Sequence, residues 1–183
     1  MINVTRFTCV RKAVIINVTG LEDQLCPYCG GNLFVHGTCK RHLKTTGGNV
    51  ILRLRVMECR KCGATHREMP HGLVPYRRYS AEMLCAIFTG YLPEKNEDTD
   101  SIDTRTSVER KEYAEDACMC DPSIRQRIIE WLSCFLTRVQ NMAEIRSDRT
   151  LASDSICCRL KRYVRILINS GKWKQHRFTM PSS

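Results

Sequence analysis

CPYCGG (residues 26–31) and CRKCGA (residues 59–64) carry the strongest structural signal in this 183-residue chain. Each stretch contains two cysteines separated by two residues, and a glycine follows the second cysteine. A tight turn of this kind aims two thiolates at one cation about 2.3 Å away, and the glycine permits the turn. The sequence therefore predicts a single tetrahedral zinc ion. Its four expected ligands are Cys26, Cys29, Cys59 and Cys62.

Four thiolates complete a tetrahedral zinc site and leave no open position for a substrate, so the predicted role of the metal is structural. Three alternatives stay open: four buried free thiols, a redox-active cysteine pair, and a site in which His66 or His71 replaces one cysteine. Redox chemistry of this motif uses a single pair. Two similar pairs therefore favour a shared metal.

The residues around the cysteine pairs read as strands. Runs at 33–43 and 50–57, joined by turn-forming residues at 45–49, predict a hairpin held at its base by the metal. Residues 2–19 alternate polar and β-branched side chains and predict one or two more strands. PHGLVPYRRY (residues 70–79) has two prolines and a glycine, which favours an extended connector.

Basic residues of this hairpin and connector are candidate phosphate contacts, which would orient a nucleic acid without reading its sequence. A solvated strand face is the alternative for each of them. The candidates are Lys40, Arg41, Lys44, Arg53, Arg55, Arg77 and Arg78.

The second half of the chain reads as helical. Ser80 is suited to cap a helix over residues 81–91, and Asp121 with Pro122 is suited to begin a long amphipathic helix. The acidic stretch 93–103 lacks apolar periodicity and predicts a solvated loop. A short helix at 107–117 and a last helix at about 154–169 complete the expectation.

Residues 112–133, EYAEDACMCDPSIRQRIIEWLS, fit a helix, a tight turn and a capped second helix, as in a helix-turn-helix. The second helix of such a motif enters the major groove, where arginine suits guanine and glutamine suits adenine. An amphipathic helix with a solvated charged face is the alternative. The predicted base contacts are Ser123, Arg125, Gln126 and Arg127.

The overall charge fits a polyanion partner. Lys and Arg number 29 and Asp and Glu 19, for a net charge of +10. The excess lies on both flanks of an acidic middle segment, and basic flanks favour binding to phosphates through counterion release. No run of about 18 apolar residues occurs, so we expect no membrane span and a cytoplasmic location, where the 12 cysteines are reduced.

The order of CPYCGG, the hairpin, LRVMECRKCGATHREMPHGLVPYRRYS (residues 54–80) and DPSIRQRIIEWL (residues 121–132) resembles an uncharacterised family. It is a domain-of-unknown-function group of short bacterial proteins associated with mobile elements, with a transposase-like zinc ribbon followed by a helix-turn-helix. The resemblance is strongest over residues 26–80 and looser over 121–136. It implies DNA binding within a transposon or integrated element, metal binding by the four cysteines, and no known catalytic activity.

Together these inferences predict an α+β fold. A zinc-ribbon β-hairpin module spans residues 1–79, a small helix-turn-helix-like domain spans 80–169, and a basic tail spans 170–183. The predicted function is non-catalytic DNA binding with one structural Zn²⁺. We expect no catalysis, because metal-dependent strand transfer needs well-separated carboxylates that converge from a folded sheet, whereas here the acidic residues crowd into one polar loop and few strands follow the ribbon. The alternative is a protein-interaction or dimerisation module, in which the C-terminal amphipathic helices pair with a second copy or with an element-encoded partner.

Overall fold

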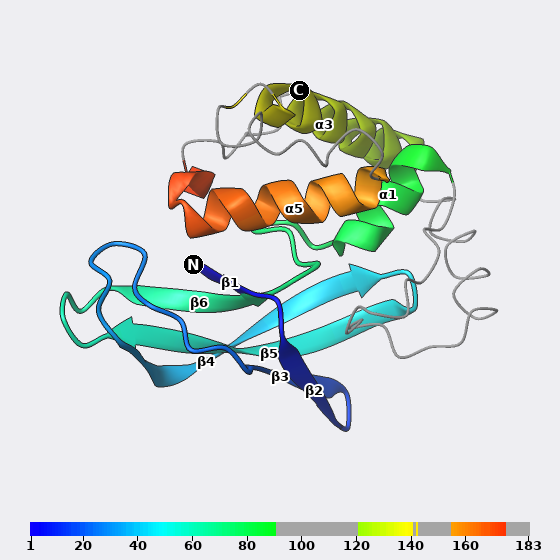
Figure 1. Ribbon diagram of the computed structural model, residues 1–183. Coiled ribbons are helices and arrows are strands. Elements are labelled where there is room, and N and C mark those ends of the chain that lie inside the picture. The colour runs from blue at the N-terminus through cyan, green and yellow to red at the C-terminus, as the bar shows by residue number, and fades with distance from the viewer. Residues whose placement is uncertain (91–120, 141, 143–154, 175–183) are drawn as a thin grey trace.

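The computed structural model describes residues 1–90, 121–140, 142 and 155–174. A strongly curled mixed sheet forms one layer, and helices cover one of its faces (Figure 1). The strands are β1 (Ile2–Val4), β2 (Phe7–Lys12), β3 (Ile15–Gly20), β4 (Leu33–Thr45), β5 (Gly48–Cys59) and β6 (Thr65–Pro70). The helices are α1 (Ala81–Thr89), α3 (Pro122–Gln140) and α5 (Ile156–Asn169), followed by the short 3-10 helix η2 (Lys172–Lys174).

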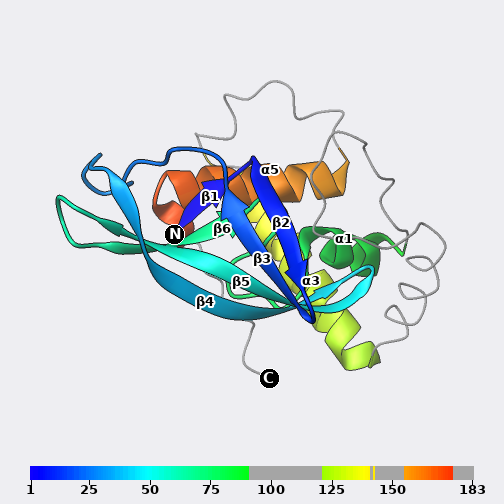
Figure 2. The same cartoon turned by 90° about the horizontal axis from the view of Figure 1, so that it is seen from below.

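Strand β5 is the centre of the sheet. One of its edges pairs with β4 in a long antiparallel hairpin from Leu33↔Cys59 to Thr45↔Gly48. Its other edge is shared, because β3 pairs with residues 51–53 and β6 with residues 56–58. The sheet therefore divides into two wings beyond β5, β3–β2 and β6–β1, as the view from below shows (Figure 2).

A buried ion pair joins the two wings where β5 changes partner. The Arg55 guanidinium donates two hydrogen bonds to the Glu68 carboxylate, at 2.7 and 2.8 Å, and a third to the Gly20 carbonyl. The second carboxylate oxygen of Glu68 also accepts from the Gly20 backbone N–H. A Cβ at Gly20 would lie 2.6 Å from Glu68, so the contact requires glycine there. Arg55 thus links β5, β6 and the end of β3.

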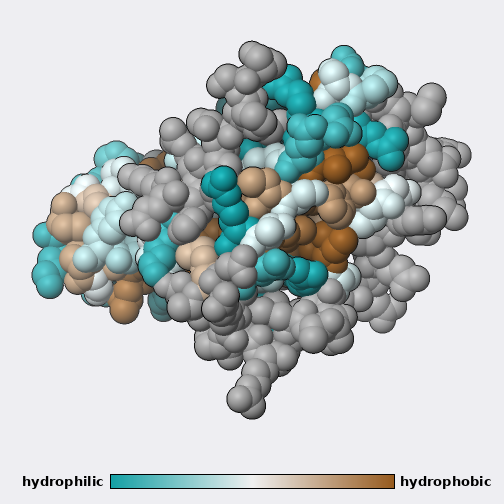
Figure 3. Space-filling view, turned by 90° about the horizontal axis from the view of Figure 1, so that it is seen from above, coloured by the Kyte–Doolittle hydropathy of each residue, from teal (hydrophilic) through white to brown (hydrophobic). Residues whose placement is uncertain are grey.

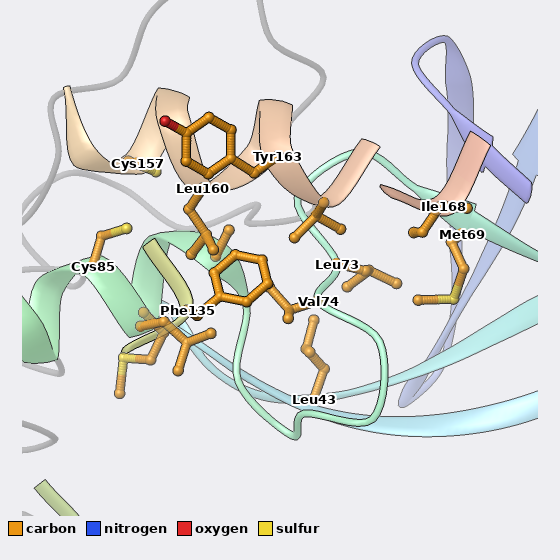
Figure 4. Close-up of a cluster of buried hydrophobic side chains, with 14 of the residues drawn as sticks. Leu43, Met69, Leu73, Val74, Cys85, Phe135, Cys157, Leu160, Tyr163 and Ile168 are labelled. Atoms are coloured by element: carbon orange, nitrogen blue, oxygen red, sulfur yellow. The ribbon is translucent and has the colours of Figure 1, made fainter. Parts of the chain in front are cut away.

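The hydrophobic core lies between the sheet and the helices. Figure 4 shows Leu73 and Val74 of the connector meeting Phe135 of α3 and Leu160 and Tyr163 of α5. All five side chains are at most 2% exposed. In the space-filling view from the helix side, the most hydrophobic residues gather near the middle of the face (Figure 3). Sheet and helices therefore share one core.

This arrangement corrects the predicted fold class. The chain does not form a zinc-ribbon module followed by a small helix-turn-helix domain. The helices instead lie on a six-stranded sheet, because the apolar stripe of α3 packs on α1 and joins a core that also contains Val4, Ile16 and Leu52 of the sheet. The N-terminal region contributes three strands, where the sequence predicted one or two.

Most of the local predictions are confirmed. The hairpin and its turn occupy the predicted segment as β4 and β5. The Ser80 hydroxyl accepts a hydrogen bond from the Met83 N–H, and Gly90 ends α1 in the left-handed conformation. The Asp121 carboxylate accepts from the Ser123 N–H at the start of α3, where Pro122 is the first helical residue.

Two predictions fall outside the described residues: the acidic loop at 93–103 and the helix at 107–117. The boundaries at 79/80 and 169/170 stay predictions. Within the part of the chain that the structure describes, no helix combines the length and apolar character that a bilayer crossing requires.

Candidate metal centre and basic cleft

The two cysteine pairs form two turns of the same geometry, which we call the knuckles, residues 26–31 and 59–64. In the first, the Gly30 N–H donates to the Cys26 carbonyl, and the Cys26 N–H donates to the Gly31 carbonyl. The second repeats both hydrogen bonds with Gly63, Cys59 and Ala64. Gly30 and Gly63 have φ angles of 67° and 68°, a conformation that glycine adopts without a steric penalty. The predicted role of both glycines is confirmed.

The four sulfurs lie close enough to bind one metal ion. All are within 4.8 Å of one another, and the Cys26–Cys62 and Cys29–Cys59 sulfur pairs are 3.7 and 3.4 Å apart. Four sulfurs placed about 2.3 Å from a tetrahedral ion would be about 3.8 Å apart. Cys26 and Cys59 are buried, at 2% and 1% exposure. The donor set therefore fits a closed, thiolate-bound metal.

Backbone N–H groups support the thiolate form of Cys59, whereas the pKa of Cys29 is raised to about 12, against a backbone hydrogen bond with Gly31, by burial and by the neighbouring thiols. Burial acts to raise the pKa of Cys59, but the N–H groups of Cys62 and Lys61 stabilise its thiolate and lower that pKa to about 7. Metals bind the thiolate rather than the thiol. The N–H groups of the second knuckle thus favour the form of Cys59 that binds a metal.

The histidine alternatives have separate positions. His66 is 1% exposed, and its Nε2 lies 3.4 Å from the Cys26 sulfur, where an N–H can donate to that ligand. Its ring also contacts Tyr28, with ring centroids 5.2 Å apart. His71 lies instead beside Lys161 and Arg165 of α5. Among the described residues, the group of side chains close enough to hold a metal ion contains the four cysteines and neither histidine.

The β4–β5 hairpin runs from the metal centre to a cleft. The knuckles flank the base of the hairpin, at the left in Figure 1, and the turn at residues 45–48 lies at the opposite end near α1. The connector, residues 71–80, lies along β4 there: the Lys44 N–H donates to the Arg78 carbonyl, and the Ser80 N–H donates to the Lys44 carbonyl.

Between this connector and β4 lies a cleft of about 740 Å³, which we call the basic cleft. Six lysine and arginine residues from three segments of the chain line it, together with His42. No aspartate or glutamate is among the described residues of its lining. The six cationic residues are Lys40, Arg41, Lys44, Arg67, Arg77 and Arg78.

Arg41 is the innermost cation of the cleft. Its guanidinium donates hydrogen bonds to the carbonyls of Val74 and Arg77, which fixes the connector to the sheet. Burial lowers its pKa to about 10, and the positive charge of Arg67 contributes to that change. No carboxylate among the described residues pairs with it. Arg41 therefore places a positive charge in the cleft wall.

Two further cations of the cleft lie against aromatic rings. The Arg77 guanidinium is 4.1 Å from the ring centroid of Trp131 on α3, and the Lys44 ammonium is 5.5 Å from that of Tyr79. Burial lowers the pKa of Arg77. Cation–π contacts of this kind hold the charges in place without neutralising them.

The structure thus brings together five of the predicted phosphate contacts: Lys40, Arg41, Lys44, Arg77 and Arg78. Arg53 is opposite Lys40 in the strand register, outside the cleft lining. Arg55 is committed to Glu68. The predicted base contacts are exposed in the first turns of α3 and are also outside that lining: Ser123, Arg125, Gln126 and Arg127.

Sequence reasoning assigned no role to Arg67 or Tyr76, which both line the cleft. Arg67 is on β6 and Arg41 on β4, so only the fold brings them together. Tyr76 carried a local signal, because it follows Pro75 in a turn and has two arginines after it.

Residues 26–110 match the family model described as "Domain of unknown function (DUF6431)". The matched range includes both knuckles, the hairpin, the connector and α1, and it supports the resemblance to an uncharacterised family. The match carries no statement about zinc, helix-turn-helix motifs or mobile elements. No curated protein and no solved structure matches the chain.

Proposed function

We propose that this protein is a non-catalytic nucleic-acid-binding protein in which one structural zinc ion holds the β4–β5 hairpin and the basic cleft binds phosphates. The observation that carries the proposal is that six lysine and arginine residues line one cleft without a described carboxylate. Phosphates of a nucleic acid are spaced along a chain, and a row of cations of this kind matches such a ligand.

Side-chain contacts join the elements of the cleft wall. Arg41 ties the connector to the sheet, and Arg77 is held by Trp131. Lys40, Lys44, Arg67 and Arg78, by contrast, are exposed residues of the lining. We propose that the exposed residues contact phosphates directly. The more buried cations contribute to the positive potential that attracts those phosphates.

Zinc is the metal we propose, because four thiolates at tetrahedral spacing are the usual donor set of a structural zinc site. Metal analysis of reduced, folded protein should give one zinc per chain. A chelator should remove the zinc and unfold the hairpin, with loss of nucleic-acid binding. Folded protein that retains its binding with well below one metal ion per chain would contradict this assignment.

The cleft assignment is tested with two matched double variants. Lys40→Ala/Arg78→Ala removes two charges from the cleft, and Arg125→Ala/Arg127→Ala removes two exposed charges from α3. Binding of a labelled oligonucleotide, followed by fluorescence anisotropy at fixed salt, should weaken about tenfold in the cleft variant and by less than about twofold in the α3 variant.

The reverse result, with loss of binding in the α3 variant only, would contradict the proposal. Equal loss in both variants would indicate a general charge effect and would contradict it as well. Thermal unfolding of both variants, measured in the same buffer, serves as the control for folding.

The protein-interaction alternative has less support. It requires the apolar stripes of the last helices to face a partner, but these stripes pack in the core of the protein. Leu132 and Phe135 of α3 and Leu160 and Leu167 of α5 are completely buried. We also propose a role within a mobile element, in the cytoplasm. Only the resemblance to the uncharacterised family supports this part of the proposal. Selection of bound DNA from a random pool tests it, since such a role requires a preferred sequence.

A further inference from the structure

We infer that the basic cleft binds single-stranded nucleic acid, with one base stacked on Tyr76. This inference rests on the proposed function and specifies the form of the ligand. It begins with the backbone of the turn that carries Tyr76.

Residues 74–77 form a hydrogen-bonded turn, in which the Arg77 N–H donates to the Val74 carbonyl at 3.2 Å. Pro75 is the second residue and Tyr76 the third, with a φ of 61°. A turn with proline second and a positive φ third is of type II, and its third position favours glycine or asparagine. A bulky aromatic residue is strained there.

The strained position displays the ring. Tyr76 is 57% exposed, although Val74, two residues earlier, is 1% exposed. Arg41 bonds to the carbonyls of Val74 and Arg77, one on each side of Tyr76. The turn is therefore held by a buried side chain from β4, and the ring is presented at the cleft by a fixed backbone.

The surroundings of the ring combine charge with aromatic surface. Arg77 and Arg78 follow Tyr76 directly, and Lys40 and Arg41 line the same cleft. Sites for single strands pair a positive groove with an aromatic face on which a base stacks. A duplex keeps its bases stacked on one another and would offer only phosphates to this cleft.

The test compares a short mixed-sequence single strand with the duplex of the same sequence, using the full chain. Three variants separate the contributions. Tyr76→Gly removes the ring and suits the turn, Tyr76→Trp keeps a stacking surface, and Lys40→Ala/Arg78→Ala removes charge.

We expect wild-type protein to prefer the single strand. Tyr76→Gly should weaken single-strand binding about tenfold, with unchanged duplex binding, an unchanged salt dependence, and a melting temperature equal to or above that of wild type. Tyr76→Trp should bind as wild type does. Ultraviolet crosslinking to a strand that contains 5-iodouracil should modify Tyr76, as located by mass spectrometry.

Failure of this inference is distinguishable from failure of the proposed function. If Tyr76→Gly binds the single strand as wild type does while Lys40→Ala/Arg78→Ala is weakened, stacking is overturned and the cleft assignment stands. Equal wild-type affinity for the duplex and the single strand would also overturn the inference. Absence of binding to both ligands would overturn the proposed function itself.

Discussion

Gly63 shows how one residue can be required by its backbone alone. Its φ is 68°, and a Cβ added there would meet nothing within 4 Å. Gly37, in the bulged part of β4, also has open space around it but is not among the residues with positive φ. Gly63→Ala should therefore lower the free energy of unfolding by about 1 kcal/mol, and Gly37→Ala should change it far less.

Urea unfolding in zinc-saturated buffer measures both changes. Equal effects of the two substitutions would show that the knuckle does not depend on a left-handed residue.

The ion pair of Arg55 with Glu68 gives a second prediction at this scale. Glu68 is 2% exposed, so removal of Arg55 leaves a buried carboxylate that has lost its ion pair and two side-chain hydrogen bonds. Arg55→Met should lower the free energy of unfolding by about 3 kcal/mol. In a double-mutant cycle, Glu68→Gln should recover part of this loss, because the amide is neutral. Purely additive effects would contradict a direct pairing.

The connector between β6 and α1 makes stability depend on pH through His71. Burial and the nearby charges of Lys161 and Arg165 lower the pKa of His71 to about 4, while Glu82 acts in the opposite direction. The unfolded chain, with a histidine pKa of about 6.5, takes up a proton first as the pH falls. The stabilisation by neutral His71 is complete above about pH 6.5 and is lost progressively towards pH 4.

The free energy of unfolding should therefore rise between pH 4 and pH 6.5, by up to about 1.4 kcal/mol per pH unit. Carboxylates also titrate in this pH range. Urea unfolding of His71→Gln across the same range therefore serves as the comparison, because it isolates the contribution of His71. Parallel pH profiles for the two proteins would exclude His71 as the cause.

Several elements could be predicted because their signals are local. The knuckle glycines, the Ser80 cap of α1 and the Asp121–Pro122 start of α3 each depend on a few neighbouring residues. The partner of Arg55 could not be predicted, since it depends on where β5 changes from β3 to β6. Arg67 was missed for the same reason: its closeness to Arg41 exists only in the folded sheet.

At the scale of the whole molecule, the amphipathic stripes of α3 and α5 identify buried faces but not the surface that covers them. A helix-turn-helix and a helix layer on a sheet need the same periodicity. Long-range strand pairing distinguishes the two arrangements. Here β3 pairs with β5, and β1 with β6, in parallel across long intervening segments. No spacing within the sequence carries that information.

The shared core predicts cooperative unfolding. Leu52 of β5 and Leu132 of α3 are both completely buried in it. Alanine at either position should lower the stability of sheet and helices together, by about 2–5 kcal/mol. Both tryptophans, Trp131 and Trp173, lie on the helical side, so their fluorescence reports that side while far-ultraviolet circular dichroism reports the whole. Coincident transitions are expected, and two separate transitions would indicate independent domains.

The salt dependence of single-strand binding tests the central claim, that the basic cleft binds phosphates, most directly. The exposed cations of the cleft are Lys40, Lys44, Arg67 and Arg78. If all four contact phosphates, the logarithm of the association constant should fall linearly with the logarithm of salt concentration, with a slope of about −3. In Lys40→Ala/Arg78→Ala the slope should be about −1.5. A wild-type slope near zero, or the same slope in both proteins, would contradict the claim.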